Sequence, residues 1–186
     1  PGTYDIAETR EARPGAIDVL DYSADGLESH QGLAALERPQ KLPNRWIRIA
    51  GPPSLEVLEA LRRKFAIDPL ALEDVVNQGQ RPKFNDFDPG LFITLSIPNR
   101  NGENQFRQAS LYAVEGLLVT FTEQDDHLFA PLEERLRKPG GRLRRRDIYF
   151  LMHAVIDLVI DLQFPLIDET AQRLEELETA IIAGPN

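Results

Sequence analysis

A polar stripe runs along one otherwise apolar segment of this 186-residue chain. From residue 149 to 164 the sequence reads YFLMHAVIDLVIDLQF, and Tyr149, His153, Asp157 and Asp161 recur in it every four residues. Residues four apart lie one above another on a single helical face. The spacing therefore predicts a helix that is buried on most sides and carries one narrow polar face. Two carboxylates one turn apart repel each other, and a cation beside them would relieve that repulsion. The stripe is thus a candidate metal-binding or partner-binding face.

A plainer interpretation of the same stripe is a solvated seam on a helix that packs through its flanks. His153 by itself is more typical of a hydrogen-bonded structural histidine than of a metal ligand. The Asp157/Asp161 pair is the stronger feature, because acidic side chains are uncommon on so apolar a helix.

A second acidic point is the pair Glu73-Asp74 within the string LALEDVV. Adjacent residues do not share a helical face, so at most one of the two joins a given site easily. The alternative is an ordinary surface helix with charges near its C-terminal end. The pair becomes a site only if it approaches Asp157 in space or across a subunit interface.

The composition limits which metals and partners are plausible. The formal net charge is −9, from 30 acidic residues against 21 Lys and Arg, and such a surface repels nucleic acid. The chain has no cysteine, so disulfides and thiolate metal sites are excluded. A metal site must use oxygen atoms and the three histidines, which favours hard ions such as Mg²⁺ or Ca²⁺.

A basic cluster stands out in this acidic chain. Its members are Arg135, Arg137, Lys138, Arg142, Arg144, Arg145 and Arg146. Such a cluster can contact lipid headgroups or nucleic acid. No aromatic residues are interleaved with it, and a helix C-terminus followed by a glycine loop is a natural place for solvated arginines. We favour the solvated interpretation.

Catalytic motifs are absent from the sequence. It contains no GxGxxG, P-loop, GxSxG or HExxH pattern, and its three histidines show no metalloenzyme spacing. The sequence therefore predicts a protein that is not an enzyme.

The N-terminal residues PGTYDIAETREARPG are polar, so no signal peptide is expected. The stretch nearest to a membrane span is 148–167, but a central Asp costs about 2.5–3.5 kcal/mol there. We expect that stretch to belong to a soluble core. The chain begins at Pro1 without an initiator Met and stops at Asn186 after an amphipathic helix, so we expect a piece of a longer protein.

Local patterns predict strands followed by long helices, which indicates an α+β or mixed α/β domain with a helical extension. Strands are expected over 16–22, 27–30, 45–50, 91–97, 105–114 and 117–122. Helices are expected over 33–37, 55–65, 68–76, 129–137 and from about 144 onward. A loop is expected over 77–90 and a kink at Pro165. The expected division is a flexible segment 1–15, a domain 16–140 and a helical extension 141–186.

Three strings in this order resemble the cytoplasmic domain of the CorA family of divalent-cation (Mg²⁺/Co²⁺) transporters. They are DPLALEDVVNQGQRPKF at 68–84, QASLYAVEGLLVTFTEQDDHLFAPLEERLR at 108–137 and RRRDIYFLMHAVIDLVIDLQFPLIDETAQRLEELE at 144–178. The likeness extends over about residues 40 to 183 and keeps the spacing of all three strings.

The resemblance implies an α/β/α sandwich with a mixed parallel/antiparallel sheet, followed by long C-terminal helices that lead to a membrane stalk. It also implies a homopentamer at the cytoplasmic face of the inner membrane, with no organic cofactor. Mg²⁺ or Co²⁺ ions would bind between adjacent domains and hold the pore closed. The family's metal-site acids match Glu73, Asp74, Asp157 and Asp161.

The chain also departs from the family pattern. The family's transmembrane helices and Gly-Met-Asn loop lie after the long stalk helix, beyond Asn186. The acidic partner of Asp74 across the interface belongs to that same helix. Zinc-transporting relatives share the architecture, so the ion stays open. The rival hypothesis from another class is a soluble α+β interaction module whose acidic C-terminal helix docks a partner helix.

Overall fold

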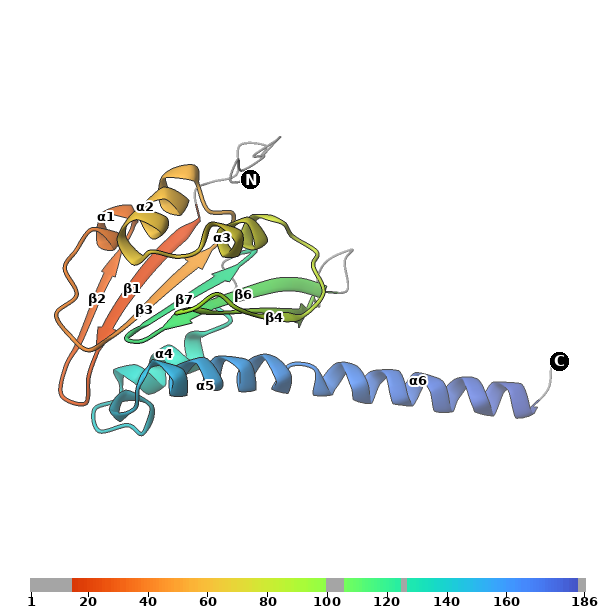
Figure 1. Cartoon of the computed structure of the whole chain (residues 1–186). Helices are drawn as coiled ribbons and strands as arrows, with labels where there is room; N and C mark the ends of the chain where they lie inside the picture. Colours follow the sequence, from red (N-terminus) through yellow and green to blue (C-terminus); the bar gives the residue numbers. More distant parts are fainter. Residues whose placement is uncertain (1–14, 100–105, 125–126, 184–186) are drawn as a thin grey trace.

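A mixed sheet of seven strands divides the molecule into layers (Figure 1). The computed structural model describes residues 15–99, 106–124 and 127–183. The strand order is β2-β1-β3-β7-β6-β5-β4. The strands are β1 (Ala16–Tyr22), β2 (Leu27–Gln31), β3 (Asn44–Ala50), β4 (Lys83–Asp86), β5 (Leu91–Pro98), β6 (Phe106–Val114) and β7 (Leu117–Thr122). Only β3 and β7 pair in parallel among them, and the other neighbours are antiparallel.

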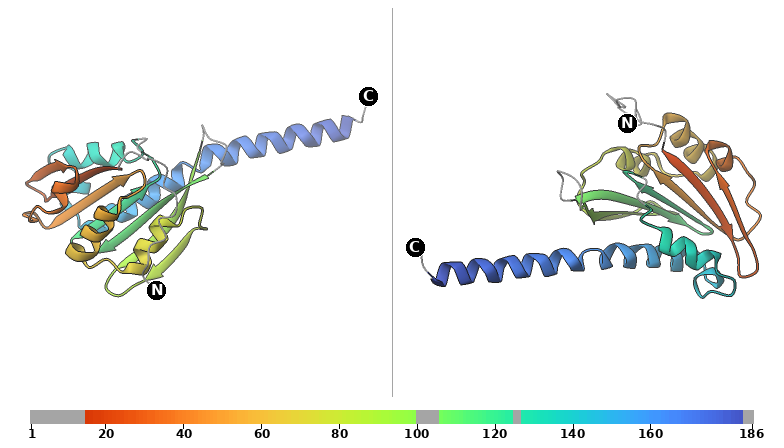
Figure 2. Two further views of the ribbon diagram at one scale, coloured as in Figure 1. Left: turned by 90° about the horizontal axis from the view of Figure 1, so that it is seen from above. Right: turned by 180° about the vertical axis from the view of Figure 1, so that it is seen from behind.

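Helices cover both faces of the sheet, as Figure 1 and the two views of Figure 2 show. One face carries α1 (Leu33–Leu36), α2 (Leu55–Phe65) and α3 (Pro69–Val76). The other carries α4 (Ala130–Arg137) and α5 (Ile148–Asp161). Helix α6 (Phe164–Ala183) continues almost in line with α5 and projects beyond the sheet. The α/β/α sandwich with a mixed sheet, expected from the resemblance, is confirmed.

Side chains of β3 alternate between two hydrophobic cores, one on each face of the sheet. Trp46 packs toward α4 and α5, while Ile47 and Ile49 pack toward α1 to α3. All three side chains are almost completely buried, and each such apolar side chain contributes about 1.5–3 kcal/mol. The indole Nε1 of Trp46 donates a hydrogen bond to Oγ1 of Thr120 at 3.1 Å, so its one polar atom is satisfied inside the core.

Side-chain caps begin three of the helices. Oγ of Ser54 accepts from the backbone N of Val57 at 3.4 Å, and Oδ1 of Asp68 accepts from the N of Leu70 at 2.8 Å. Asp147 caps α5 through the N of Phe150 at 3.0 Å. A cap of this kind is worth about 1 kcal/mol. Each of these caps fixes where its helix begins.

The predicted loop 77–90 is wrong in part, because it contains strand β4 (Lys83–Asp86). This strand pairs antiparallel with β5, with Phe84 opposite Ile93. Its residues KFND have little strand propensity of their own, so backbone pairing with the neighbouring strand decides the conformation. A short 3₁₀ turn, η1 (Leu143–Arg145), also precedes α5 where a continuous helix was expected.

Helix α5 carries the narrow exposed face that its spacing predicted, made by Tyr149, His153, Asp157, Ile160 and Asp161. Its flanks pack partly buried against the core through Phe150, Met152, Ile156 and Leu158. Leu151, Val155 and Val159 are almost fully buried against the sheet, whereas Ile160 is 50% exposed. Most large apolar residues of α6 are exposed, whereas Leu166 is half-buried. The exposed ones are Phe164, Ile167, Leu174, Leu177, Ile181 and Ile182. Within the described ranges, no element covers the outer side of α5 or the apolar side of α6. Composition alone cannot distinguish an apolar surface that is packed from one that is open.

The helical run Ile148–Ile182 is long and apolar enough, by length and composition alone, to cross a membrane, contrary to the expectation from its acidic residues. A core helix of a soluble protein meets the same two criteria. The first half of the run does pack Leu151 and Val155 into the core with Trp46.

The expected domain division is not tested by these contacts. The predicted flexible segment 1–15 falls outside the described residues except for Gly15. Leu143 and Ile148, beyond the predicted boundary at 140, share a core with Trp46 and Leu118. Residues on both sides of position 140 therefore contribute to one core.

Candidate functional site

Helix α3 presents the acidic pair at its last turn. Ala71, Leu72 and Val75 face the core, and this leaves Glu73 exposed and Asp74 half-buried at the edge of the helix. The two carboxylates therefore point in different directions, as expected for adjacent helical residues. Of the two carboxylates, that of Asp74 contacts other polar groups among the described residues.

The Asp74 carboxylate already has partners within the chain. Nζ of Lys83 lies 2.7 Å from its Oδ1, and Nδ2 of Asn85 donates to Oδ2 at 3.5 Å. Both partners come from β4, the strand that local patterns did not predict. The side chains of Asp74 and Lys83 are 19% and 32% exposed, so the ion pair lies at the surface but is partly shielded from water.

The backbone beside that carboxylate is also held in place. The carbonyl oxygen of Asp74 accepts from Nε2 of Gln80 at 3.1 Å and from Nε2 of Gln108 at 3.2 Å. Oε1 of Gln108, itself buried, accepts from the backbone N of Gln80 at 3.1 Å. These bonds join the end of α3 to β6 and to the segment that leads into β4. They hold the backbone of the residue whose carboxylate the sequence singled out.

The acidic stripe on α5 has a different setting. His153, Asp157 and Asp161 are exposed on the side of the helix that faces away from the sheet, and Tyr149 is 39% exposed. Within the described part of the chain, neither aspartate forms an ion pair or a hydrogen bond through its carboxylate. The solvated-seam description fits this chain taken alone. The geometry also leaves both carboxylates free for a ligand or partner from outside.

A single copy of the chain does not bring the predicted metal-site residues together. Helices α3 and α5 lie on opposite faces of the sheet, so Asp74 is separated from Asp157 and Asp161 (Figure 1). No group of three or more His, Asp or Glu residues able to hold a metal ion is found among the described residues. The oxygen donors fit a hard cation, but further ligands must come from outside the described chain.

Phe150 organises part of the basic cluster. The guanidinium groups of Arg142 and Arg146 lie 5.4 Å and 5.8 Å from the centre of its ring. Arg144 is buried, and its Nε donates to the carbonyl oxygen of Ser23 at 3.0 Å. Arg145 is exposed. The arginines are thus not uniformly solvated: one has a structural role, and Phe150 is an aromatic contact that the sequence pattern did not show.

Sequence reasoning found Asp74 but missed Lys83, Asn85, Gln80 and Gln108 around it. Lys83 lies nine positions after Asp74, and no helical or strand period relates the two. The short connection 77–82 could have indicated that the residues after it lie near Asp74. So short a segment cannot carry the chain far from the end of α3.

Comparison with known proteins places this fold and these residues in a family. The family model described as "CorA-like Mg²⁺ transporter protein" matches residues 44–186. The cobalt/magnesium transport protein CorA of Thermotoga maritima is 29% identical over 178 residues, which is 91% of this chain and 50% of that protein. The chain therefore spans about half the length of that relative.

Solved structures share the fold at low sequence identity. The soluble domain of CorA from Methanocaldococcus jannaschii superposes with a TM-score of 0.68 at 18% identity, over 94% of this chain and 67% of that one. The ZntB cytoplasmic domain from Vibrio parahaemolyticus gives a TM-score of 0.63 at 17% identity, over 86% and 65%. With the family model matched over more than half of its residues, this chain belongs to the CorA-like Mg²⁺ transporter family.

Proposed function

We propose that this chain is the metal-sensing and gating domain of a divalent-cation transporter and lies at the cytoplasmic face of the inner membrane. Family membership over residues 44–186 is the observation that carries the proposal. The match to the soluble domain of a CorA protein supports its placement outside the bilayer. The transmembrane part would follow α6, and the full-length protein would be a homopentamer.

The proposed regulatory site is assembled between subunits. Asp74, with Glu73 beside it, would face an acidic group of the neighbouring subunit, and Asp157 and Asp161 would supply the second acidic surface. This fits the geometry, because one copy holds the two acidic points on opposite faces of its sheet and leaves Asp157 and Asp161 exposed. A cation that bridges such surfaces favours the closed assembly, and its loss restores repulsion between the acids.

The donor chemistry favours Mg²⁺, with Co²⁺ as the other candidate. The proposed ligands are carboxylates only, and Mg²⁺ prefers oxygen ligands and keeps several of its waters. Zinc in proteins takes Cys and His ligands readily, and this chain has no cysteine. A zinc-transporting relative is the alternative within the family, since the ZntB domain has the same fold.

A metal titration of the full-length protein tests the sensor. Millimolar Mg²⁺ should protect it from limited proteolysis, and at ten times the dissociation constant a single site stabilises the bound form by about 1.4 kcal/mol. Asp74→Ala and Asp157→Ala should each weaken that protection. Glu59→Ala removes an exposed acid of α2 that lines a hollow with Leu33 and Glu37, and it should leave the Mg²⁺ midpoint unchanged.

The controls decide between the sensor and a general charge effect. If Asp74→Ala and Glu59→Ala shift the midpoint equally, the ion only screens the surface charge and no specific site exists. If the full-length protein shows no Mg²⁺-dependent protection while Zn²⁺ gives it, the zinc-transporting alternative is favoured.

The exposed apolar side of α6 favours a second candidate, a soluble interaction module. Ile167, Leu174 and Ile181 recur every seven residues and are at least 57% exposed, which suits docking of a partner helix. Sequencing the coding region downstream of Asn186 distinguishes the transporter domain from the soluble interaction module. Two apolar spans of about 20 residues favour the transporter, whereas an early stop codon favours the soluble module.

A further inference from the structure

Lys83 holds the position beside Asp74 that a bound cation would take. We propose that the Lys83 ammonium group is a built-in competitor for the cation at Asp74 and so sets the affinity of the sensor. This inference rests on the proposed function and deepens it. It begins from the separation of 2.7 Å between Nζ of Lys83 and Oδ1 of Asp74.

Asp74 is held both at its backbone and at its carboxylate. Its backbone carbonyl is tied to Gln80 and Gln108, and Asn85 contacts the second carboxylate oxygen. A direct bond from a divalent ion to Oδ1 would place two positive charges next to the ammonium group. Lys83 must then move away, or the ion must bind through its water shell.

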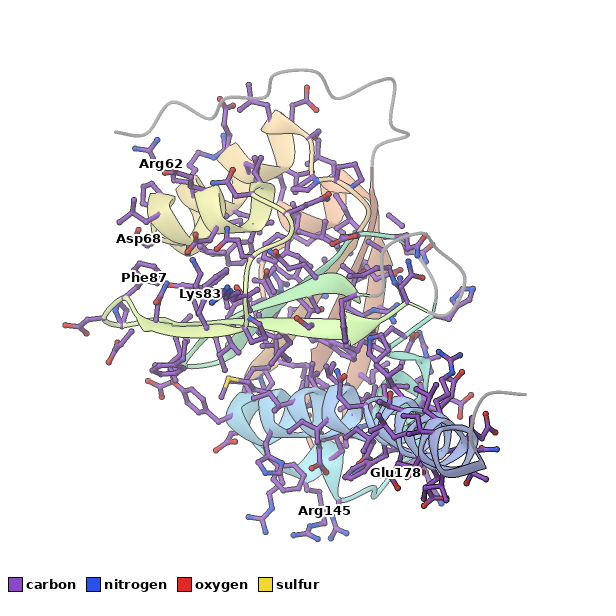
Figure 3. All side chains as sticks on the ribbon, turned by 90° about the vertical axis from the view of Figure 1, so that its right-hand side faces the viewer. Arg62, Asp68, Lys83, Phe87, Arg145 and Glu178 are labelled. Carbon is purple, nitrogen blue, oxygen red and sulfur yellow. The ribbon has the colours of Figure 1, made fainter. Side chains whose placement is uncertain are left out.

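Lys83 is able to leave. It comes from the edge strand β4, and its side chain is 32% exposed on a flexible four-carbon stem. Figure 3 shows Lys83 on the side of the sheet that carries α2 and α3, while Arg145 and Glu178 lie on the opposite side. A side chain of this kind swings into solvent without disturbing the core, so exchange between ammonium and metal requires no refolding.

The exchange explains why the site can be both ordered and weak. Without metal, Lys83 neutralises the half-buried Asp74, which keeps the carboxylate in place. With metal, part of the binding free energy is used to displace the ammonium group. A partly exposed ion pair contributes modestly, so the competition should weaken binding about three- to tenfold.

The competitor acts on charge and not on coordination geometry. Its removal should therefore tighten the binding of Mg²⁺ and Co²⁺ by the same factor. A Lys83 that instead helped to shape the site would change the ratio between the two ions, because the ions differ in their preferred ligands.

The test is a titration of Lys83→Met, and of Lys83→Gln as a second neutral variant, in the full-length protein. The readout is the midpoint of protection from proteolysis by Mg²⁺ and by Co²⁺. Both variants should lower both midpoints about three- to tenfold, and Lys83→Arg should stay within about twofold of the wild type. Lys41→Met is the matched control, since Lys41 pairs with Glu28 at 3.7 Å on the opposite edge strand. It should shift neither midpoint.

A double variant tests whether Lys83 acts on the midpoint through Asp74. In an Asp74→Asn background, Lys83→Met should no longer lower the midpoint. Suppose that Mg²⁺ protects the wild type, that Asp74→Ala weakens this protection, and that the neutral Lys83 variants leave the midpoint unchanged or raise it. The proposed competition by Lys83 is then wrong, while the proposed sensor is still supported. If the wild type shows no response to either ion, the proposed sensor fails, and the role of Lys83 with it.

Discussion

The two faces of the sheet differ in whether their acidic and apolar side chains have partners within the chain. On the face covered by α1 to α3, Asp21 and Arg45 form a fully buried ion pair at 2.6 Å, and Asp74 is paired with Lys83. On the face covered by α5, Asp157 and Asp161 are exposed and the apolar side of α6 is open. These two acids of the first face, which we call the closed face, are paired within one chain. The second holds groups that a single chain does not satisfy.

The difference shows where the molecule is built to meet something else. A buried charge without a partner costs several kcal/mol, so the closed face must supply partners from its own chain. An exposed carboxylate or isoleucine costs much less free energy when it has no partner. Such a side chain is available to contact a ligand, a neighbouring subunit or another segment. Three experiments would break or sharpen this contrast.

The largest effect should come from Asp21→Ala on the closed face. This change leaves Arg45 buried without its carboxylate, although Nη1 of Arg45 still donates to the carbonyl oxygen of Arg38 at 3.0 Å. We expect a loss of about 3–5 kcal/mol in the free energy of unfolding. Urea denaturation measures it. A loss below about 1 kcal/mol would show that the pair is not needed and that the contrast between faces is overstated.

An intermediate effect should separate the two halves of the C-terminal helical run. Leu151 in α5 is fully buried, so Leu151→Ala should cost about 2–5 kcal/mol. Leu174→Ala in α6 makes the same chemical change at a position that is 57% exposed, and it should stay within about 0.5 kcal/mol. Thermal unfolding of this chain compares the pair. A cost above 1 kcal/mol for the α6 variant would mean that a partner already covers α6.

The smallest effect is expected on the open acidic stripe. Asp157→Asn removes the repulsion between carboxylates one turn apart, so α5 should be unchanged or stabilised by a few tenths of a kcal/mol in the absence of metal. The difference in unfolding free energy between Asp157→Asn and the parent chain measures it. Clear destabilisation would indicate that Asp157 already has a partner in solution.

Local sequence signals predicted most of the elements because their causes are local. The caps at Ser54 and Asp68, the alternation of Trp46 with Ile47 and the turn at Gly116 each act within a few residues. The fold class followed from the order of these elements and from the family resemblance. Strand β4 was missed because its four residues become a strand only by pairing with β5.

The candidate site could be predicted only in its residue types. Acidic residues at 74 and 157 are visible as exceptions to their surroundings, and the absence of cysteine favours a hard cation as their ligand. The sequence alone thus determined the candidate acidic residues, the helices that carry them and the family resemblance. Tertiary structure decided that α3 and α5 lie on opposite faces of the sheet and that Lys83 stands against Asp74. The first fact depends on pairing between strands far apart in the chain, such as β3 with β7, and the second on the pairing of β4 with β5. No local period encodes either of them.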